Sequence, residues 1–578
     1  MNLTSFDWII ILVYFGISLA IGIWASYQAG QDTKSFFLAG QNMPWWLLGI
    51  SMVATTFSTD TPNLVTDIVR QNGVSGNWTW WAFLLTGMLT VFVYARLWRR
   101  SGVLTDIEFY ELRYSGKAAS FLRGFRALYL GLVFNVLVMG AVSLAAIKFG
   151  EIVLGWPGWL TLTIACSITL LYSTLGGLKA IIVTDFIQFA LAMAGSLCAM
   201  FYILGLEQIG GLSNLILHTN VIDKLAIIPN MSDPNAWVPV LFVPLAVQWW
   251  ASYYPGAEPG GGGYIAQRMF SAKDENHAVG ATLLFNVAHY ALRPWPWILI
   301  ALASLVVFPE LSDLQTAFPD LPADKLGHDV AYPAMLTLLP SGLLGLVAAS
   351  LIAAFMSTMS TQVNLGASYL VNDFYHRFIK PDATEQQLVL AGRLFTIISL
   401  ILGAGLGLML KSAGQAFNLL LMIGSGTGMI YILRWFWWRI NAYTEIVAMV
   451  SSVVIAGYFN FANSGFQDWE KIIIGAFLTT IVWIIATYIT PPDDEETLLN
   501  FVQKVNPGGP GWKKFHDGDS HDPWSVPNGI VAMILGCIAV YGLLLGFGQV
   551  IYGQTVSGIA LLTLALLAAL RLKKRLQI

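Results

Sequence analysis

Hydroxyl side chains gather in an apolar stretch between residues 46 and 69, where polar groups are costly and therefore indicate function. The stretch holds five hydroxyls, a carboxylate and a proline in close succession: Thr55, Thr56, Ser58, Thr59, Asp60, Thr61 and Pro62. Because proline removes a backbone donor and clashes with the preceding turn, we expect the helix to break here. A break frees carbonyl oxygens that can bind a cation. The alternative is a proline kink whose hydroxyls bond back to their own helix.

A second group of hydroxyls lies in the apolar stretch 333–371. Ser357, Ser360 and Thr361 are spaced i, i+3 and i+4, so a helix would place them on one face, with Thr358 beside them. Oxygen ligands suit a hard cation. The alternative is helix packing, which also favours small hydroxyl residues.

A carboxylate follows the pair Gly176-Gly177, which predicts a tight turn between two apolar stretches. Asp185 lies two helical turns beyond it, so an isolated carboxylate there would take up a proton unless a cation or hydrogen-bond donors stabilise it. Lys179 is closer to the membrane surface, where its amine is expected to extend into water rather than pair with Asp185.

The stretch 236–266 is interrupted by two prolines and five glycines within nine residues, in the run YPGAEPGGGGY. No regular helix tolerates this composition, and irregular backbone at membrane depth must line protein or a cavity. Glu258 lies within the interruption, and His289 and Arg293 follow in the next stretch. We expect Glu258 and Arg293 to form a structural ion pair; alternatively either side chain faces a bound solute.

Composition places these residues in a membrane protein. Of 578 residues, 56% are apolar and 11% are charged, against about 25% charged in a typical soluble domain, and the mean hydropathy is +0.66. The net charge of −3, three scattered cysteines and seven scattered histidines exclude a nucleic-acid binder, a disulfide scaffold and a metal cluster. A soluble enzyme is excluded as well.

We count fifteen candidate transmembrane helices, each with about 20 mostly apolar residues: 7–28, 46–69, 76–98, 125–148, 157–177, 180–206, 236–266, 278–308, 333–371, 388–410, 414–437, 442–463, 472–490, 528–548 and 553–571. With the N-terminus outside, 23 of the 30 Lys and Arg residues lie on the inner side and six on the outer side. The positive-inside rule therefore predicts an N-out, C-in topology.

The two interrupted stretches are separated by four intact ones, which is typical of inverted-repeat transporters with a midplane site. The sequence thus predicts an all-α polytopic protein with a 5+5 repeat, one helix before it and about four after it. We divide the chain into a leading helix with its inner loop, a first repeat, an outer loop, a second repeat, and accessory helices with a cytoplasmic loop at 491–527: residues 1–45, 46–206, 207–235, 236–437 and 438–578.

Three runs carry a resemblance to the sodium:solute symporter family, which includes sodium-coupled sugar, proline and sialic acid carriers. They are FFLAGQNMPWWLLGISMVATTFSTDTP, GGLKAIIVTDFIQ and AAFMSTMSTQVNLGASYLVNDFY, in the same order on the corresponding helices. The similarity covers about residues 5–440. It implies a LeuT-type fold and alternating access driven by sodium.

The resemblance also implies site residues. The family's shared sodium site uses backbone carbonyls of the broken helix and of the stretch 333–371, plus two hydroxyls; the matching positions here are Ala54, Phe57, Ala354, Ser357 and Thr358. Some members bind a second sodium ion, for which the matching residues are Asp185, Ser357, Ser360 and Thr361. We therefore expect two sodium ions per transport cycle, one of them serving as the counter-ion of Asp185.

Solute recognition departs from the resemblance. Sugar carriers of the family place Gln or Glu side chains beyond the break and on the eleventh helix, where this chain has Asp60-Thr61 and Asn418 with Leu421. Typical hexose recognition is therefore not expected. The candidate solute contacts are Asp60, Thr61, Trp249, Tyr253, Glu258, His289 and Asn418.

Together these patterns predict a sodium-coupled symporter that imports a small polar solute (a sugar, amino acid or organic acid) across a bacterial inner membrane, without nucleic acid or an obligatory protein partner. A proton-coupled carrier, with Asp185 or Asp60 as the titrating group, is the nearest alternative. A polytopic membrane enzyme would need a nucleophile–base pair, metal cluster or cofactor motif, and the sequence offers none. A transport-derived sensor would need a soluble signalling domain, for which the closing segment RLKKRLQI is too short.

Overall fold

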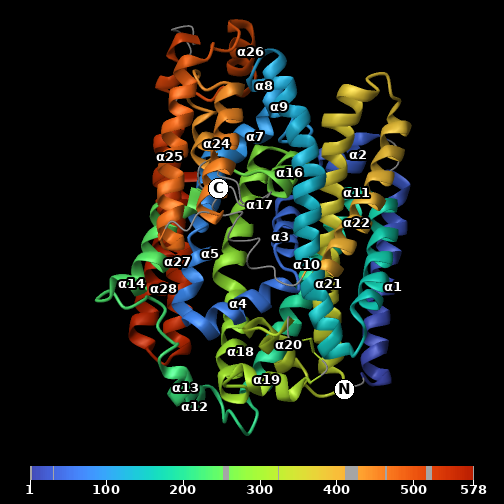
Figure 1. The fold of residues 1–578 in the computed structure, drawn as a ribbon, viewed down its shortest axis with the longest axis vertical. Helices are drawn as coiled ribbons and strands as arrows, with labels where there is room; N and C mark the ends of the chain where they lie inside the picture. Colours follow the sequence, from blue (N-terminus) through green and yellow to red (C-terminus); the bar gives the residue numbers. More distant parts are fainter. Residues whose placement is uncertain are drawn as a thin grey trace.

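The computed structural model describes residues 3–29, 32–250, 260–319, 321–322, 325–410, 427–461, 465–515 and 524–576. Within these ranges the chain is helical, and a single β-bridge between Met43 and Ala272 is its only extended pairing. Most long helices run roughly parallel to one another along the long axis of the molecule (Figure 1). The longest α-helices are α1 (Ser5–Ala29), α10 (Asn135–Phe149), α11 (Gly158–Leu204), α18 (Pro294–Val307), α21 (Leu343–Ser368), α22 (Glu385–Met409), α24 (Ala442–Phe461), α25 (Asp468–Ile489), α27 (Val526–Ile551) and α28 (Thr555–Leu576).

Eleven helical segments in the described part of the chain are long and apolar enough to cross a membrane. Three shorter apolar helices, Trp45–Thr55, Gly158–Leu171 and Pro234–Ala246, fall within further predicted spans. The protein is therefore a multi-pass, all-α membrane protein. Most of the predicted span 414–437 lies outside the described residues, so the count of fifteen spans stays a prediction, as do the orientation and the division into two repeats.

The break in the first polar stretch is confirmed. Helix α3 (Trp45–Thr55) ends before Thr56, and α4 (Asp60–Asn72) begins four residues later. Pro62 lies in the first turn of α4, where a backbone N–H has no intrahelical acceptor and its loss costs little. The proline therefore permits a new helix to start after the break.

The second interruption is also present on both sides of residues 251–259, which lie outside the described residues. Before it the chain forms only short helical pieces: α14 (Pro234–Trp237), a π-helical turn at Val238–Phe242, α15 (Val243–Ala246) and a 3₁₀ turn at Gln248–Trp250. After it, Gly260 and Gly261 have φ angles of 86° and 81°, and α16 (Gly263–Ser271) begins. Such positive φ angles are accessible mainly to glycine, so the glycine run sets where the helix restarts.

The turn predicted at Gly176-Gly177 is confirmed within α11. Gly177 has a φ of 54° and a ψ of −157°, which interrupts the helical geometry. A Cβ atom at this position would lie 2.6 Å from the carbonyl oxygen of Phe36. The predicted spans 157–177 and 180–206 therefore meet at a position that requires glycine for both conformation and space.

Two predicted span boundaries are wrong. The stretch 333–371 contains α20 (Ala331–Leu336) and a separate α21, which begins at Leu343 after Gly342 (φ 85°) turns the chain. A π-helical segment, Tyr369–Ile379, then extends this span. The predicted span 125–148 starts earlier, with α9 (Gly116–Leu128). Lys117 and Arg123, which precede the predicted span, concealed that start; Arg123 pairs with Glu111 and Asp373.

Polar segments lie at opposite ends of the helices. In Figure 1, α8 (Phe109–Arg113), α9 and α26 (Glu495–Val505) are at the top, whereas α12 (Leu212–Leu217), α13 (Thr219–Ile222), α19 (Leu311–Ala317) and the N-terminus are at the bottom. The sequence assigns the first group to the inner side and the second to the outer side. Alternation of the spans across the membrane accounts for this separation.

The segment 491–515 is packed against the helices through Arg113, whose side chain is fully buried. The guanidinium donates to the carbonyl oxygens of Arg434, Trp437 and Ile440. It also lies 5.4 Å from the ring of Phe501 and 4.9 Å from that of Trp512, within the range of a cation–π interaction. The loop predicted at 491–527 is therefore partly helical and docked.

Helix α11 packs against α1, α3 and α21, and α16 contacts both α3 and α21. Because α3 and α16 directly adjoin the two interruptions, the two breaks are held next to the intact helices α11 and α21. The candidate site lies among these four helices.

Candidate ion and solute site

A hydroxyl of α21 faces the break between α3 and α4. Oγ1 of Thr358 donates a hydrogen bond of 2.9 Å to the carbonyl oxygen of Thr55 and lies 3.4 Å from that of Phe57. Thr358 is buried. Carbonyls freed by the break thus turn towards a hydroxyl of a facing helix, as the shared sodium site requires.

This oxygen set fits a hard monovalent cation. The carbonyl oxygens of Thr55 and Phe57 keep further lone pairs, and a hydroxyl that rotates away from them offers an oxygen instead of a proton. The carbonyl of Ala54 accepts a turn hydrogen bond of 3.1 Å from the N–H of Phe57, so the break is a compact turn. The Thr55 carbonyl was missed from the sequence, because the resemblance pointed to the residues on either side of it.

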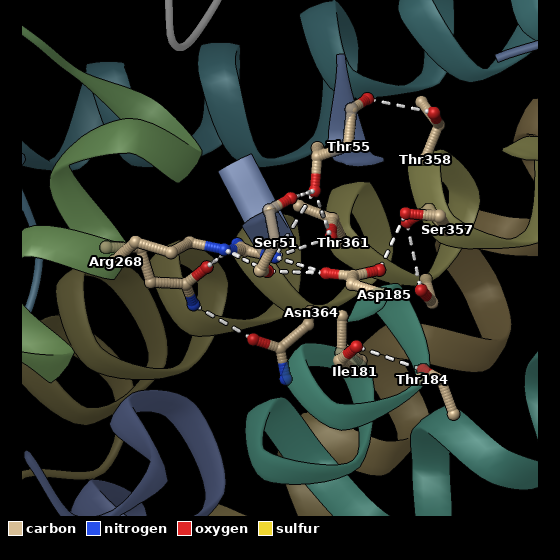
Figure 2. A network of polar contacts seen from close by, with 12 residues as sticks. Ser51, Thr55, Ile181, Thr184, Asp185, Arg268, Ser357, Thr358, Thr361 and Asn364 are labelled. Atoms are coloured by element: carbon tan, nitrogen blue, oxygen red, sulfur yellow. Dashed lines mark hydrogen bonds and ion pairs between the residues drawn. The ribbon is translucent and has the colours of Figure 1, made fainter. Parts of the chain in front are cut away.

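The Asp185 carboxylate is fully buried on α11 and accepts two hydroxyl donors from different helices. Oγ of Ser357 lies 2.6 Å from Oδ1, and Oγ of Ser51 lies 2.5 Å from Oδ2. Figure 2 shows Asp185 between these two serines, with Arg268 reaching in from the far side of Ser51. The prediction that Asp185 needs donors or a cation is confirmed, and it has both.

The cation beside Asp185 is an arginine of α16. Nη2 of Arg268 lies 3.5 Å from Oδ2 of Asp185, and both side chains are fully buried. The guanidinium also donates 2.7 Å to Oγ1 of Thr361, 3.2 Å to Oγ of Ser51 and 3.0 Å to Oε1 of Gln267. Four helices thus converge on one buried ion pair.

The structure brings together three of the four residues predicted for the second sodium ion. Asp185 and Ser357 are in direct contact, and Thr361 contacts Arg268 and, at 3.1 Å, Oγ1 of Thr55. Ser360 instead donates 3.0 Å to the carbonyl of Ser357 on its own helix. Arg268 and Ser51 were not predicted from the sequence. Spacing offered a signal for Ser51, which is one helical turn before Thr55, but nothing near position 268 indicated a partner 83 residues earlier in the chain.

A second polar group lies on the other side of the break, where Thr56, His289 and Arg293 contact one another. Nη1 of Arg293 donates 3.2 Å to the carbonyl of Val53 and 3.1 Å to Oγ1 of Thr56. The Thr56 hydroxyl donates 2.8 Å to the same Val53 carbonyl, and it lies 3.1 Å from Nδ1 of His289. Arg293 therefore stabilises the last turn of α3.

Both ring nitrogens of His289 have polar neighbours. Nδ1 lies 3.1 Å from Oγ1 of Thr56, and Nε2 lies 3.5 Å from Nη2 of Arg293. The imidazole therefore bridges the last turn of α3 and the guanidinium.

The remaining solute candidates are less closely grouped. Oγ1 of Thr61 is 3.4 Å from both the Thr56 carbonyl and the Ser58 N–H, so this hydroxyl caps the break. Asp60, Thr61 and His289 keep partial exposure, as expected for residues that a solute could reach. Trp249 offers its carbonyl to the hydroxyl of Thr86, and its ring packs against Trp250.

Three candidates, Tyr253, Glu258 and Asn418, lie outside the described residues, and so does the expected pair of Glu258 with Arg293. Aromatic rings surround the part of the group that is described. Trp80 lies 5.7 Å from His289 and 6.0 Å from Tyr290, and Phe57 stacks on Trp297 at 5.0 Å. The polar atoms at the break are thus bordered by flat apolar surfaces.

This fold is shared with a solved membrane transporter. A Na⁺-coupled sialic acid symporter, in a substrate-bound outward-open state, superimposes with a TM-score of 0.67 over 85% of this chain and 99% of the other, at 20% identity. At that identity the likeness concerns the fold, which is LeuT-like as expected.

The chain belongs to the sodium:solute symporter family, whose sequence profile matches residues 36–454. It is 25% identical to a sodium/glucose cotransporter of Vibrio parahaemolyticus over 515 residues, covering 86% of this chain and 92% of the relative. It is 29% identical to a sodium/mannose cotransporter of Bos taurus over 474 residues, covering 76% of each. The protein is therefore a transporter that couples the symport of a small solute to sodium.

Proposed function

We propose that this chain imports a small polar solute without net charge across a bacterial inner membrane, driven by two sodium ions per cycle. The first ion would bind at the α3–α4 break, to carbonyls of Ala54, Phe57 and Ala354 and hydroxyls of Ser357 and Thr358. The observation that carries this proposal is the Thr358 hydroxyl turned onto the carbonyls of Thr55 and Phe57.

The second ion would bind between α11 and α21, at Asp185, Ser357, Ser360 and Thr361. The support for this site is the contact of Ser357 with Asp185, which joins the two helices through a carboxylate oxygen. Because Ser357 belongs to both proposed sites, the two ions would share one ligand and their binding would be coupled.

The solute is proposed to lie beyond the break, against Asp60, Thr61 and His289, with Trp249, Tyr253, Glu258 and Asn418 as further contacts. Asp60 lies within electrostatic range of Arg293, so an ionised Asp60 would offset the charge of the guanidinium and a neutral solute would need no further counter-ion. The names of the sugar-transporting relatives agree with a neutral polar solute. A sugar ranks first among the candidates, ahead of a zwitterionic amino acid, although it would be bound without the Gln or Glu side chains that the family's sugar carriers place at these positions.

The test is a thermal-stability screen of the purified protein in lipid. Sodium should raise the melting temperature relative to choline at equal ionic strength, and the solute should raise it further only when sodium is present. Sugars, amino acids and organic acids form the three arms of the screen. Stabilisation by an organic acid alone would contradict a neutral solute, and uptake driven by a pH gradient without sodium would favour the proton-coupled alternative.

A further inference from the structure

The buried cation Arg268 lies where the second sodium ion is proposed to act. Its guanidinium is 3.5 Å from Asp185 and its Nη2 is 2.7 Å from the hydroxyl oxygen of Thr361. Both residues are among the four proposed ligands of that ion. The position is thus supplied with a positive charge by the protein itself.

Two cations beside one carboxylate would leave a net positive charge in a fully buried place. Burying an uncompensated charge is costly, and breaking a buried pair commonly costs several kcal/mol. Arg268 and a sodium ion therefore compete for Asp185, because both need the same negative charge.

The directions of the hydrogen bonds also indicate that Arg268 and a sodium ion compete for this position. The hydroxyls of Ser51 and Ser357 direct their protons at the carboxylate, and the oxygens of Ser51 and Thr361 accept N–H donors from Arg268. A sodium ion needs oxygen lone pairs that face inwards, so the arginine must release Thr361 before that oxygen can bind the ion. The side chain has another acceptor on its own helix, because Nη1 donates 3.0 Å to Gln267.

We propose that Arg268 is a tethered cation that neutralises Asp185 in the absence of sodium and is displaced from it by the second sodium ion. This inference rests on the second ion site described under the proposed function. Arg268 belongs to α16, which begins directly after the second interruption. A sodium ion bound between α11 and α21 would thereby release a side chain of α16, the helix that follows the glycine run.

Replacing Arg268 tests whether it competes with sodium for Asp185. In Arg268→Gln, sodium should stabilise the purified protein at a half-maximal concentration about tenfold lower than in the wild type, the equivalent of about 1.4 kcal/mol. The variant should also melt at a lower temperature in choline, because Asp185 loses its partner, and recover most of that loss in sodium.

A matched control is Arg434→Gln, which breaks the buried pair of Arg434 with Glu445 away from the proposed ion sites. This control should lower the melting temperature equally in choline and sodium. The double variant Asp185→Asn/Arg268→Gln should melt near the wild type in choline and lack the gain in sodium affinity. Equal half-maximal sodium concentrations for Arg268→Gln and the wild type would overturn the proposal.

If Arg268→Gln folds neither in sodium nor in choline, the variant Arg268→Lys tests the competition instead. Its shorter amine pairs more weakly with Asp185, so its half-maximal sodium concentration should also fall, and an unchanged value would overturn the competition. A wild-type protein without any sodium response would instead refute the proposed function, which separates the two failures.

Discussion

The hydroxyl of Thr358 donates its proton to the carbonyl oxygen of Thr55, the last residue of α3, over 2.9 Å. The two residues are 303 positions apart in the chain. This hydrogen bond joins the broken first helix of one predicted repeat to an intact helix of the other. An ion that binds at the break between α3 and α4 would therefore also contact α21.

Replacing Thr358 by alanine should weaken the first sodium site. The variant loses one oxygen ligand, and we expect the half-maximal sodium concentration for uptake to rise at least about tenfold. Thr358→Ser should keep near-normal affinity because it keeps the oxygen. Thr282→Ala is a suitable control, since within the described part of the chain the buried Thr282 hydroxyl bonds back to its own helix at Ala278 and to no other side chain. Equal sodium dependence in Thr358→Ala and Thr282→Ala would remove Thr358 from the site.

Asp185→Asn should lower the sodium-to-solute ratio from two to one, measured as the reversal potential of uptake in vesicles. The lost charge is worth about 2.3 kcal/mol at 100 mV, so maximal accumulation of solute should fall about 40-fold from the membrane potential alone. Asp373→Asn serves as the control, because Asp373 is an equally buried carboxylate that pairs with Arg123 at 2.7 Å. A ratio that is the same in both variants would indicate that Asp185 binds no transported ion.

His289→Phe should alter solute binding and leave sodium affinity within about twofold, a difference below 0.5 kcal/mol. Phenylalanine keeps the ring that packs against Trp80 and Tyr290 but loses the nitrogen atoms that face Thr56 and Arg293. Solute affinity is measured from the uptake rate at saturating sodium. The opposite pattern, normal solute affinity with weakened sodium binding, would place His289 in the ion path.

Glu111 provides a prediction about pH. It lies between two spans and is contacted by Arg377 at 3.0 Å, Ser120 at 2.5 Å and Arg123 at 2.7 Å. Burial by itself would raise the pKa of this carboxyl, but these hydrogen bonds outweigh it and lower the pKa from 4.5 to about 2. A lowered carboxyl pKa contributes stability that is fully present above pH 4.5 and is lost as the pH falls towards 2.

Glu111→Gln should therefore destabilise the protein by roughly 3 kcal/mol at neutral pH, and the loss should shrink below pH 4.5 and be nearly gone at about pH 2. Glu495→Gln is the control, because Glu495 is a fully exposed carboxylate whose only described ion pair is with Lys514. Lys514 also lowers the pKa of Glu495, but water screens this exposed pair, so the Glu495→Gln deficit should be much smaller than that of Glu111→Gln at every pH. A Glu111→Gln deficit that is independent of pH would mean that the carboxylate is not held ionised by its arginines.

Gly177→Ala should cost more stability than Gly155→Ala. Gly155 has left-handed helical geometry (φ 66°, ψ 24°), which alanine adopts at a cost of about 1–3 kcal/mol, whereas Gly177 (φ 54°, ψ −157°) has a conformation that is essentially restricted to glycine. At Gly155 a Cβ atom meets open space, whereas at Gly177 it would lie 2.6 Å from the Phe36 carbonyl. The difference between the two melting temperatures therefore contains both the larger backbone strain at Gly177 and its contact with Phe36. Equal losses would show that Gly177 is not required for either reason.

Local chemistry made part of this structure predictable from sequence. Thr56 to Thr59 are followed by Asp60 and Pro62, and the helix breaks there because proline starts a helix more readily than it continues one. The glycine run before α16 and the turn at Gly177 follow from the same backbone preferences. Span boundaries were less predictable where a largely buried arginine such as Arg123 interrupts the apolar pattern while it pairs with Glu111 and Asp373.

Only part of the candidate site was predictable from the sequence. Asp185 could be recognised from the sequence because an ionised group in a membrane must have partners. Its partner Arg268 could not, because it follows an apolar run in a short helix and resembles any basic residue at a membrane surface. Only the convergence of α3, α11, α16 and α21 makes that arginine an interior residue. Long-range placement of this kind has no local signature.

The docking of Arg113 has a mechanical consequence. Its positive charge is held by three carbonyl oxygens and by aromatic faces that include those of Phe501 and Trp512. Pulling the 491–515 segment away would take the carboxylate of Asp493, at 3.8 Å, and the rings of Phe501 and Trp512 from this buried guanidinium. The loop between the accessory helices is therefore tied to Arg113 of α8, and the two are expected to move together.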